Sequence, residues 1–266
     1  MNILALSLLS IGLYTFGTFH QSLIYLRKAK TKPFITTLIG STAVCCQLIV
    51  TYQQIFTNNE IILSLFNTAS LVACFVISCL LLLSSRKPLQ SIFIFCYPIA
   101  AISLIGSILS NNNTLTFHPE NSGIFIHITL SIIAYSVFCI AAIQGFLVYI
   151  QNNNLKKHKP TVLLRNLPPL LTMENLLFEI IWSGTILLGV AIITGSIFVE
   201  NLFAQHLAHK TILSIIAFVI FSTLLVGRHL HGWRGLTASK WTLWGFTFLM
   251  ISFFGSKLVL EQTLGN

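Results

Sequence analysis

The chain contains no aspartate, and charged residues of any kind are scarce. All six acidic residues are glutamate, and they stand against fifteen lysine and arginine residues. A mechanism that requires Asp is therefore excluded, whether a Ser-His-Asp triad or an aspartyl-phosphate. Charged residues make up 8% of the sequence and hydrophobic residues 55%, whereas about a quarter of a soluble domain is charged. The composition predicts a protein embedded in lipid.

The sequence also lacks any Cys-x-x-Cys pair. Its six cysteines all lie inside apolar runs, at Cys45, Cys46, Cys74, Cys79, Cys96 and Cys139. A disulfide framework, a structural zinc site and a thioredoxin-type redox pair each need cysteines at other spacings. We expect these cysteines to be packing residues in helices.

Long apolar runs are what the chain has in abundance. A bilayer core about 30 Å thick needs about 20 apolar residues per helix. Eight runs meet this requirement, near residues 3–26, 34–55, 61–83, 89–109, 124–150, 175–199, 208–227 and 241–260. The expected fold is all-α, a single integral membrane domain over residues 1–266 built as a polytopic helical bundle of eight transmembrane helices. The first run is predicted to be an uncleaved span, because no positive segment precedes it and no small-residue cleavage site follows.

Basic residues mark one side of the predicted bundle. Thirteen of the fifteen lie in alternate connectors, at Arg27, Lys28, Lys30, Lys32, Arg86, Lys87, Lys156, Lys157, Lys159, Arg165, Arg228, Arg234 and Lys240. Connectors rich in Lys and Arg stay in the cytoplasm, so the N-terminus and the C-terminus are both predicted to lie outside. Anionic lipids of the inner leaflet account for the net charge of +9, so the lipid bilayer is the expected partner and no nucleic acid is.

Several histidines lie within these apolar runs or at their ends, where ionisable residues are unusual. An ionisable side chain within a membrane is a functional candidate because its burial is costly unless it is paired or ligated. His127 lies about one turn into the fifth run from its outer end. His206 and His209 lie three residues apart at the outer start of the seventh run, on one helical face. Three imidazoles are therefore predicted at the outer rim.

A second layer of histidines is predicted at the inner rim. His20 is about 17 residues into the first run, which places it about 25 Å down, and His229 follows the seventh run at that depth. Zinc usually takes three or four ligands, whereas haem iron is satisfied by one or two axial imidazoles. The 21 phenylalanines can supply an apolar wall. Two interpretations stay open: haem ligation, or histidines that snorkel to the interface or hydrogen-bond a helix carbonyl.

Glu179 is the acid that stands out in the sixth run. It is predicted to pair with Arg165 or another basic connector. A role as a proton relay in an ion-coupled transporter is the alternative, and it is the weaker one, because a single membrane acid makes a poor relay.

Several segments in the second half resemble a known family. They are "MENLLFEIIWSGTILLGVAIITG", "GRHLHGWRG", "WTLWGFTFLMISFFGSKLVL" and "IHITLSIIAYS". Together they resemble the membrane core of the cytochrome c assembly family, with its CcsA, ResC and CcmC haem-handling proteins, and look closest to the short YpjD-type inner-membrane subgroup. On this resemblance residues 1–123 form four N-terminal spans and residues 124–260 form the assembly-like core.

The resemblance implies a function and a set of ligands. The protein would bind haem without turning over a substrate, and present it at the periplasmic face of a bacterial inner membrane to apocytochrome c or another membrane assembly protein. His127 takes the place of the family's first outer haem ligand and His229 that of the histidine in the membrane layer. His20 is the opposite candidate in that layer on depth alone.

One family feature is absent from this chain. Where the family has a Trp-rich outer loop that ends in a WDPKE-like segment, this chain has "ENLFAQHLAHKT". No histidine follows the last span, so His206 or His209 is the candidate for the second outer ligand. The alternative function is a non-haem accessory or partner subunit that has kept the family fold.

Overall fold

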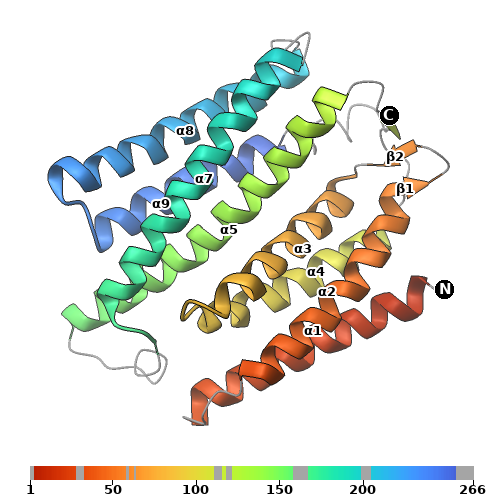
Figure 1. The fold of residues 1–266 in the computed structure, drawn as a ribbon, viewed down its shortest axis with the longest axis horizontal. Coiled ribbons are helices and arrows are strands. Elements are labelled where there is room, and N and C mark those ends of the chain that lie inside the picture. The colour runs from red at the N-terminus through yellow and green to blue at the C-terminus, as the bar shows by residue number, and fades with distance from the viewer. Residues whose placement is uncertain are drawn as a thin grey trace. The chain divides into compact units, whose positions relative to one another are not determined.

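The computed structural model is built almost entirely from long helices (Figure 1). It describes residues 3–27, 33–57, 60–62, 64–110, 116–117, 122–157, 167–198 and 205–255. The long helices are α1 (Ile3–Arg27), α2 (Pro33–Ile55), α3 (Leu65–Ser84), α4 (Phe93–Leu109), α5 (Ser122–Lys156), α7 (Leu170–Phe198), α8 (Gln205–His231) and α9 (Leu236–Met250). A helix satisfies its backbone hydrogen bonds internally, as a lipid environment requires.

Seven of the described helices are long and apolar enough to cross a membrane, which confirms the predicted polytopic helical bundle in its general form. They are α1, α2, α3, α4 with the 3-10 turn η1 (Gln90–Ile92) before it, α5, α7 and α8. The last predicted span, 241–260, corresponds to α9, which has 15 residues, and to the five-residue π-helix η2 (Ile251–Gly255) that continues it. α9 alone is shorter than the length of about 20 residues that a span needs. Residues 256–260 of that prediction lie outside the described residues.

A small sheet departs from the all-α expectation. Its strands are β1 (Phe56–Thr57), β2 (Glu60–Ile62) and β3 (Thr116–Phe117), paired antiparallel in the order β1-β2-β3. Ile61 is the partner of both Phe56 and Phe117, so the predicted start of a helix at residue 61 is wrong. α3 begins instead at Leu65, where the side chain of Ser64 caps the first turn.

The helices form two compact units. The first unit contains α1 to α4 with the small sheet, and the second contains α5, α7, α8 and α9. In each unit every helix packs against its neighbours along the chain, and the last helix packs back against the first. Each unit is therefore a closed four-helix bundle, which is the arrangement expected when short connectors join antiparallel helices.

The core of the second unit is an aromatic stack across the bundle. Phe138 of α5 and Phe221 of α8 are fully buried, with ring centroids 4.0 Å apart. Glycines face both rings: a Cβ at Gly184 of α7 would lie 3.0 Å from Phe138, and one at Gly245 of α9 would lie 2.7 Å from Phe221. The two glycines let α7 and α9 approach a pair of bulky rings, so all four helices meet at this level.

The first unit is held together by buried polar side chains as well as by apolar ones. The Tyr14 hydroxyl of α1 donates to Gln47 Oε1 of α2 at 2.6 Å, and Gln47 Nε2 donates to Ser70 Oγ of α3 at 3.0 Å. All three side chains are buried. Hydrogen bonds between helices are a common way of joining membrane helices, because each one satisfies groups that lipid cannot.

Candidate functional site

His127 is the histidine that the structure holds most firmly. Its half-buried imidazole extends from α5 towards α7, where Nδ1 lies 2.7 Å from the carbonyl oxygen of Ala191. A carbonyl oxygen only accepts, so Nδ1 carries the proton and Nε2 carries the lone pair. No other described residue hydrogen-bonds this ring. His127 is thus oriented through one nitrogen, with the other available to a ligand.

A small residue on α7 makes room for that imidazole. Gly195 lies one turn after Ala191, and a Cβ there would come within 2.8 Å of His127 Cε1. The ring therefore lies directly over the α7 backbone, which is how Nδ1 reaches a carbonyl of the same helix. The exposed side chains of Phe125, Ile126 and Phe198 are apolar surface from the same ends of α5 and α7.

The start of α8 lies at the same end of the second unit. Lys210, in the second turn of α8, is half-buried at this end. The backbone at this point is held by η2, because Ser252 Oγ donates to the Lys210 carbonyl at 2.8 Å. His209 precedes Lys210 and is exposed, and His206 is the second residue of α8, with its side chain outside the described part of the structure. The structure therefore brings His127 and the first turns of α8 to one end.

His229 lies at the other end of the same unit. It is exposed in the last turn of α8, and at 1.5 Å per residue it is about 30 Å along the helix from His209. Its neighbour Arg228 is the residue that packs inward, with its guanidinium 4.5 Å from the centroid of the Phe178 ring. The structure does not bring His229 to His127, in keeping with two separate layers.

His20 belongs to the first unit. It is half-buried in α1, and its ring stacks on Phe16 with centroids 6.3 Å apart. Its Nδ1 is buried without a hydrogen-bond partner among the described residues. Unlike His127, His20 has no hydrogen bond from Nδ1 to a carbonyl of a described residue.

Within the described ranges, no three His, Cys or Glu side chains converge as they would on a metal ion. Glu179, which the sequence singled out, is exposed, whereas Glu174 one turn earlier is only 4% exposed. α7 therefore turns Glu174 towards the other helices. The predicted pairing of Glu179 with Arg165 stays a prediction, because Arg165 lies outside the described residues.

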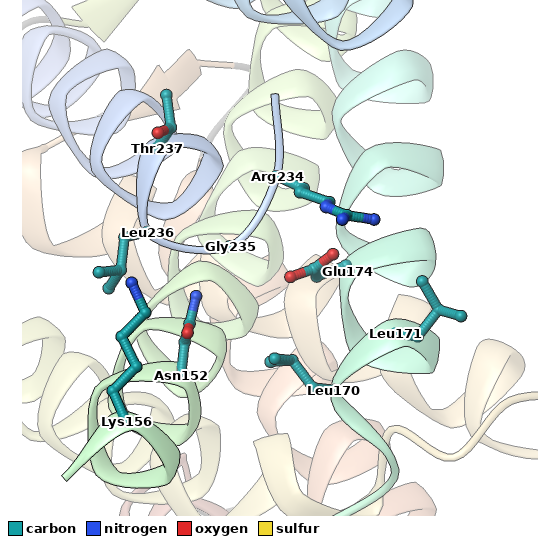
Figure 2. A pocket seen from close by; sticks show the side chains of 9 residues that line it. All are labelled: Asn152, Lys156, Leu170, Leu171, Glu174, Arg234, Gly235, Leu236 and Thr237. Carbon is teal, nitrogen blue, oxygen red and sulfur yellow. The ribbon is translucent and has the colours of Figure 1, made fainter. Parts of the chain in front are cut away.

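Glu174 lines a pocket that sequence reasoning missed. The pocket has a volume of about 500 Å³ at the His229 end of the second unit, and Figure 2 shows the side chains around it. The residues that line it are Asn152, Lys156, Leu170, Leu171, Glu174, Arg234, Gly235, Leu236 and Thr237. The available signal was the glycine that follows Arg234 in the "GWRG" segment, since Gly235 has φ +60 directly before α9, a conformation that favours glycine.

Comparison with known proteins places the chain among membrane proteins. A family model described as cytochrome C assembly protein matches residues 35–264. The match is wider than the residues 124–260 that carried the resemblance, and it begins after α1, so His20 lies outside it. No solved structure matches the chain.

Individual relatives also match the chain over half of its length or more. The chain is 30% identical over 199 residues to the inner membrane protein YpjD of Escherichia coli (strain K12), which covers 75% of each chain. It is 29% identical over 168 residues to protein HemX of Brevibacillus brevis, covering 62% of this chain and 57% of that one. An uncharacterized 28.8 kDa protein of Azospirillum brasilense is 31% identical over 142 residues, covering 53% of this chain and 52% of its own.

Proposed function

The chain belongs to the cytochrome c assembly protein family, and from that premise we propose that it binds haem in the membrane, with His127 as an axial ligand. The proposed site lies at the end of the second unit where α5 begins and α7 ends. Haem would supply an iron centre there, which the neutral imidazole of His127 would help to hold.

The observation that carries the proposal is the hydrogen bond from His127 Nδ1 to the Ala191 carbonyl. A ligating histidine usually donates its second ring N–H to a carbonyl or carboxylate, which fixes the tautomer and makes the other nitrogen a better ligand. Gly195 keeps the ring in that position, and Lys210 of α8 lies at the same end of the unit. The exposed apolar residues beside His127 suit the body of the macrocycle.

The proposal also assigns a ligand role to each of the other candidate histidines. His209 or His206 is the second ligand at this outer end, since both lie in the first two turns of α8. His229 is the ligand of the inner layer, at the opposite end of α8, and His20 is its candidate counterpart from depth alone. The assignment of His209 or His206 rests on their position in the same unit as His127. The assignment of His20 rests only on its position along α1.

The proposal also includes an orientation. The end that carries His127 faces outward, the end that carries Lys156 and Arg234 faces the cytoplasm, and α9 with η2 is the eighth span. In a bacterial inner membrane this arrangement presents haem on the periplasmic side, to apocytochrome c or to another membrane assembly protein. The positive-inside rule supports it, because Lys156 and Arg234 of the second unit line one pocket at that end.

The test is the absorption spectrum of the full chain, purified in detergent from haem-replete cells. The wild-type protein is expected to show a Soret band, and His127→Ala is expected to lose most of it. Added imidazole should restore the band in His127→Ala, because free imidazole replaces a missing ligand and cannot replace a missing packing contact. His231→Ala is the control, since His231 is an exposed residue with no place in the proposal.

A colourless wild-type protein would contradict haem binding. If that colourless protein co-purified with a stable partner, the accessory-subunit function would replace the proposal. A band that His127→Ala leaves unchanged would reject His127 as the ligand.

A further inference from the structure

The pocket lies at the end of the second unit that carries Lys156 and Arg234, called the basic end below. It is lined by more positive than negative side chains. Lys156 from the end of α5 and Arg234 from the segment before α9 both line it, against a single acid, Glu174. Neither cation forms a hydrogen bond or ion pair with a described residue. Figure 2 shows their side chains on different sides of the pocket, around Glu174 and Asn152. Two cations that no side chain neutralises favour an anionic ligand.

The start of α9 adds hydrogen-bond donors to the same space. α9 begins at Leu236, directly after Gly235, without a side-chain cap and without an acid in its first turn. The first N–H groups of a helix have no acceptor within it, and together with the helix dipole they favour an anion. Leu236 and Thr237 of this first turn line the pocket.

Glu174 imposes a second requirement on the ligand. The residue is only 4% exposed, and no described residue donates a hydrogen bond to its carboxylate or pairs with it. Its carboxylate lines the pocket and is not fully enclosed, so a ligand that donates a hydrogen bond to it is favoured there. Glu174 Oε1 and Asn152 Nδ2 lie 3.5 Å and 2.3 Å from the place where a Cβ at Gly235 would be. A side chain at position 235 would therefore clash with Asn152, and the bare backbone of Gly235 is what lies beside both polar groups.

We propose that this pocket binds the headgroup of a zwitterionic phospholipid of the ethanolamine type. Its phosphate lies with Lys156, Arg234 and the start of α9, and its ammonium donates to Glu174. Haem fits poorly here, because its carboxylates are acceptors and offer Glu174 no donor. Leu170, Leu171 and Leu236 give the pocket apolar walls, as a site for a lipid rather than for a free ion requires. Basic pockets between membrane helices on the cytoplasmic side are known places for lipid headgroups.

The test is lipid retention by the full chain, measured by native mass spectrometry after exchange into detergent with one lipid at a time. Wild-type protein is expected to retain phosphatidylethanolamine about tenfold better than phosphatidylcholine, whose ammonium has no N–H to donate. The double variant Lys156→Ala, Arg234→Ala is expected to lose about tenfold in retention of phosphatidylethanolamine. Glu174→Gln is expected to remove the preference between the two lipids.

Lys157→Ala is the matched control, because Lys157 is the neighbouring cation and does not line the pocket. Lys156 and Arg234 are exposed, so their replacement removes no core packing, and a helical circular dichroism signal checks each variant. Equal retention of both lipids by the wild type, or unchanged retention in the double variant, would overturn the proposal. Displacement of the lipid by phosphoethanolamine at equal concentration would assign the site to a soluble phosphate compound and overturn the lipid assignment. The Soret band is expected to stay unchanged in all of these variants, so this test stands apart from that of His127.

Discussion

Gly195 of α7 lies directly against the imidazole of His127 on α5. A Cβ at Gly195 would come within 2.8 Å of Cε1 and 3.0 Å of Nδ1, which is closer than side chains tolerate. The bare backbone at this position is therefore what allows Nδ1 to lie 2.7 Å from the Ala191 carbonyl.

The substitution Gly195→Ala is expected to displace the His127 ring while leaving the histidine in place. Because the added methyl group pushes the ring off the α7 backbone, the Soret absorbance per mole of protein should fall between those of wild type and His127→Ala. Gly12→Ala is the control, since a Cβ at Gly12 in α1 would meet nothing within 4 Å. Equal absorbance of Gly195→Ala and wild type would mean that the ring position does not matter for haem.

The substitution Phe221→Ala is expected to lower the free energy of unfolding of the second unit by about 3 kcal/mol, because it leaves a cavity beside Phe138. Unfolding in mixed micelles with increasing sodium dodecyl sulfate measures this change. Phe19→Ala should cost less than about 0.5 kcal/mol, since surface substitutions away from packed features usually cost little. Phe19 is 63% exposed on α1. Similar losses in the two variants would show that the stack does not form the core.

Tyr14→Phe is expected to destabilise the first unit by about 0.5–1 kcal/mol, the usual size of one interhelical hydrogen bond in a membrane. It removes the hydroxyl that donates to Gln47 and keeps the ring. The same micelle titration provides the measurement. Tyr52→Phe removes a hydroxyl from a residue that is 63% exposed, so its titration curve should overlie that of the wild type. A shift of equal size in Tyr52→Phe would argue against a specific role for the buried bond.

The proposed orientation is testable by cysteine labelling. In a background without the six native cysteines, a cysteine at Lys157 should react with an impermeant maleimide only in inverted vesicles, because the basic end is predicted to face the cytoplasm. A cysteine at Ser110, which follows the last residue of α4, should react only in right-side-out vesicles or intact spheroplasts. Labelling of both positions from the same side would reject the topology.

Much of the fold could be predicted from the sequence because hydropathy acts locally along a helix. The runs at 3–26 and 34–55 match α1 and α2 to within one or two residues. The start of the run at 61–83 was misplaced, since Ile61 and Ile62 of β2 pair with Phe117 and Thr116, far along the chain. Pairing with a distant strand leaves no local signal in an apolar sequence.

The candidate site could be predicted only in part. Depth along a helix follows from counting residues, so the separation of His209 and His229 into two levels was visible in the sequence. The bond between His127 and Ala191 was not visible, because it depends on which face of α7 meets α5. The sequence draws attention to Glu179 rather than to Glu174 for a similar reason. Hydropathy does not tell which of two acids on one helix faces a neighbouring helix.

The resemblance to the cytochrome c assembly family was visible in particular segments of the sequence. The sequence by itself also determined that this chain is a bundle of membrane helices, with thirteen of its fifteen basic residues in alternate predicted connectors. Composition and residue order suffice for that, because transfer into lipid depends on each segment's own side chains. Only the tertiary structure decided that His127 is oriented by Ala191 over Gly195, and that Glu174, Lys156 and Arg234 line one pocket. Those relationships arise where helices distant in sequence pack together, and packing depends on the shapes of both partners.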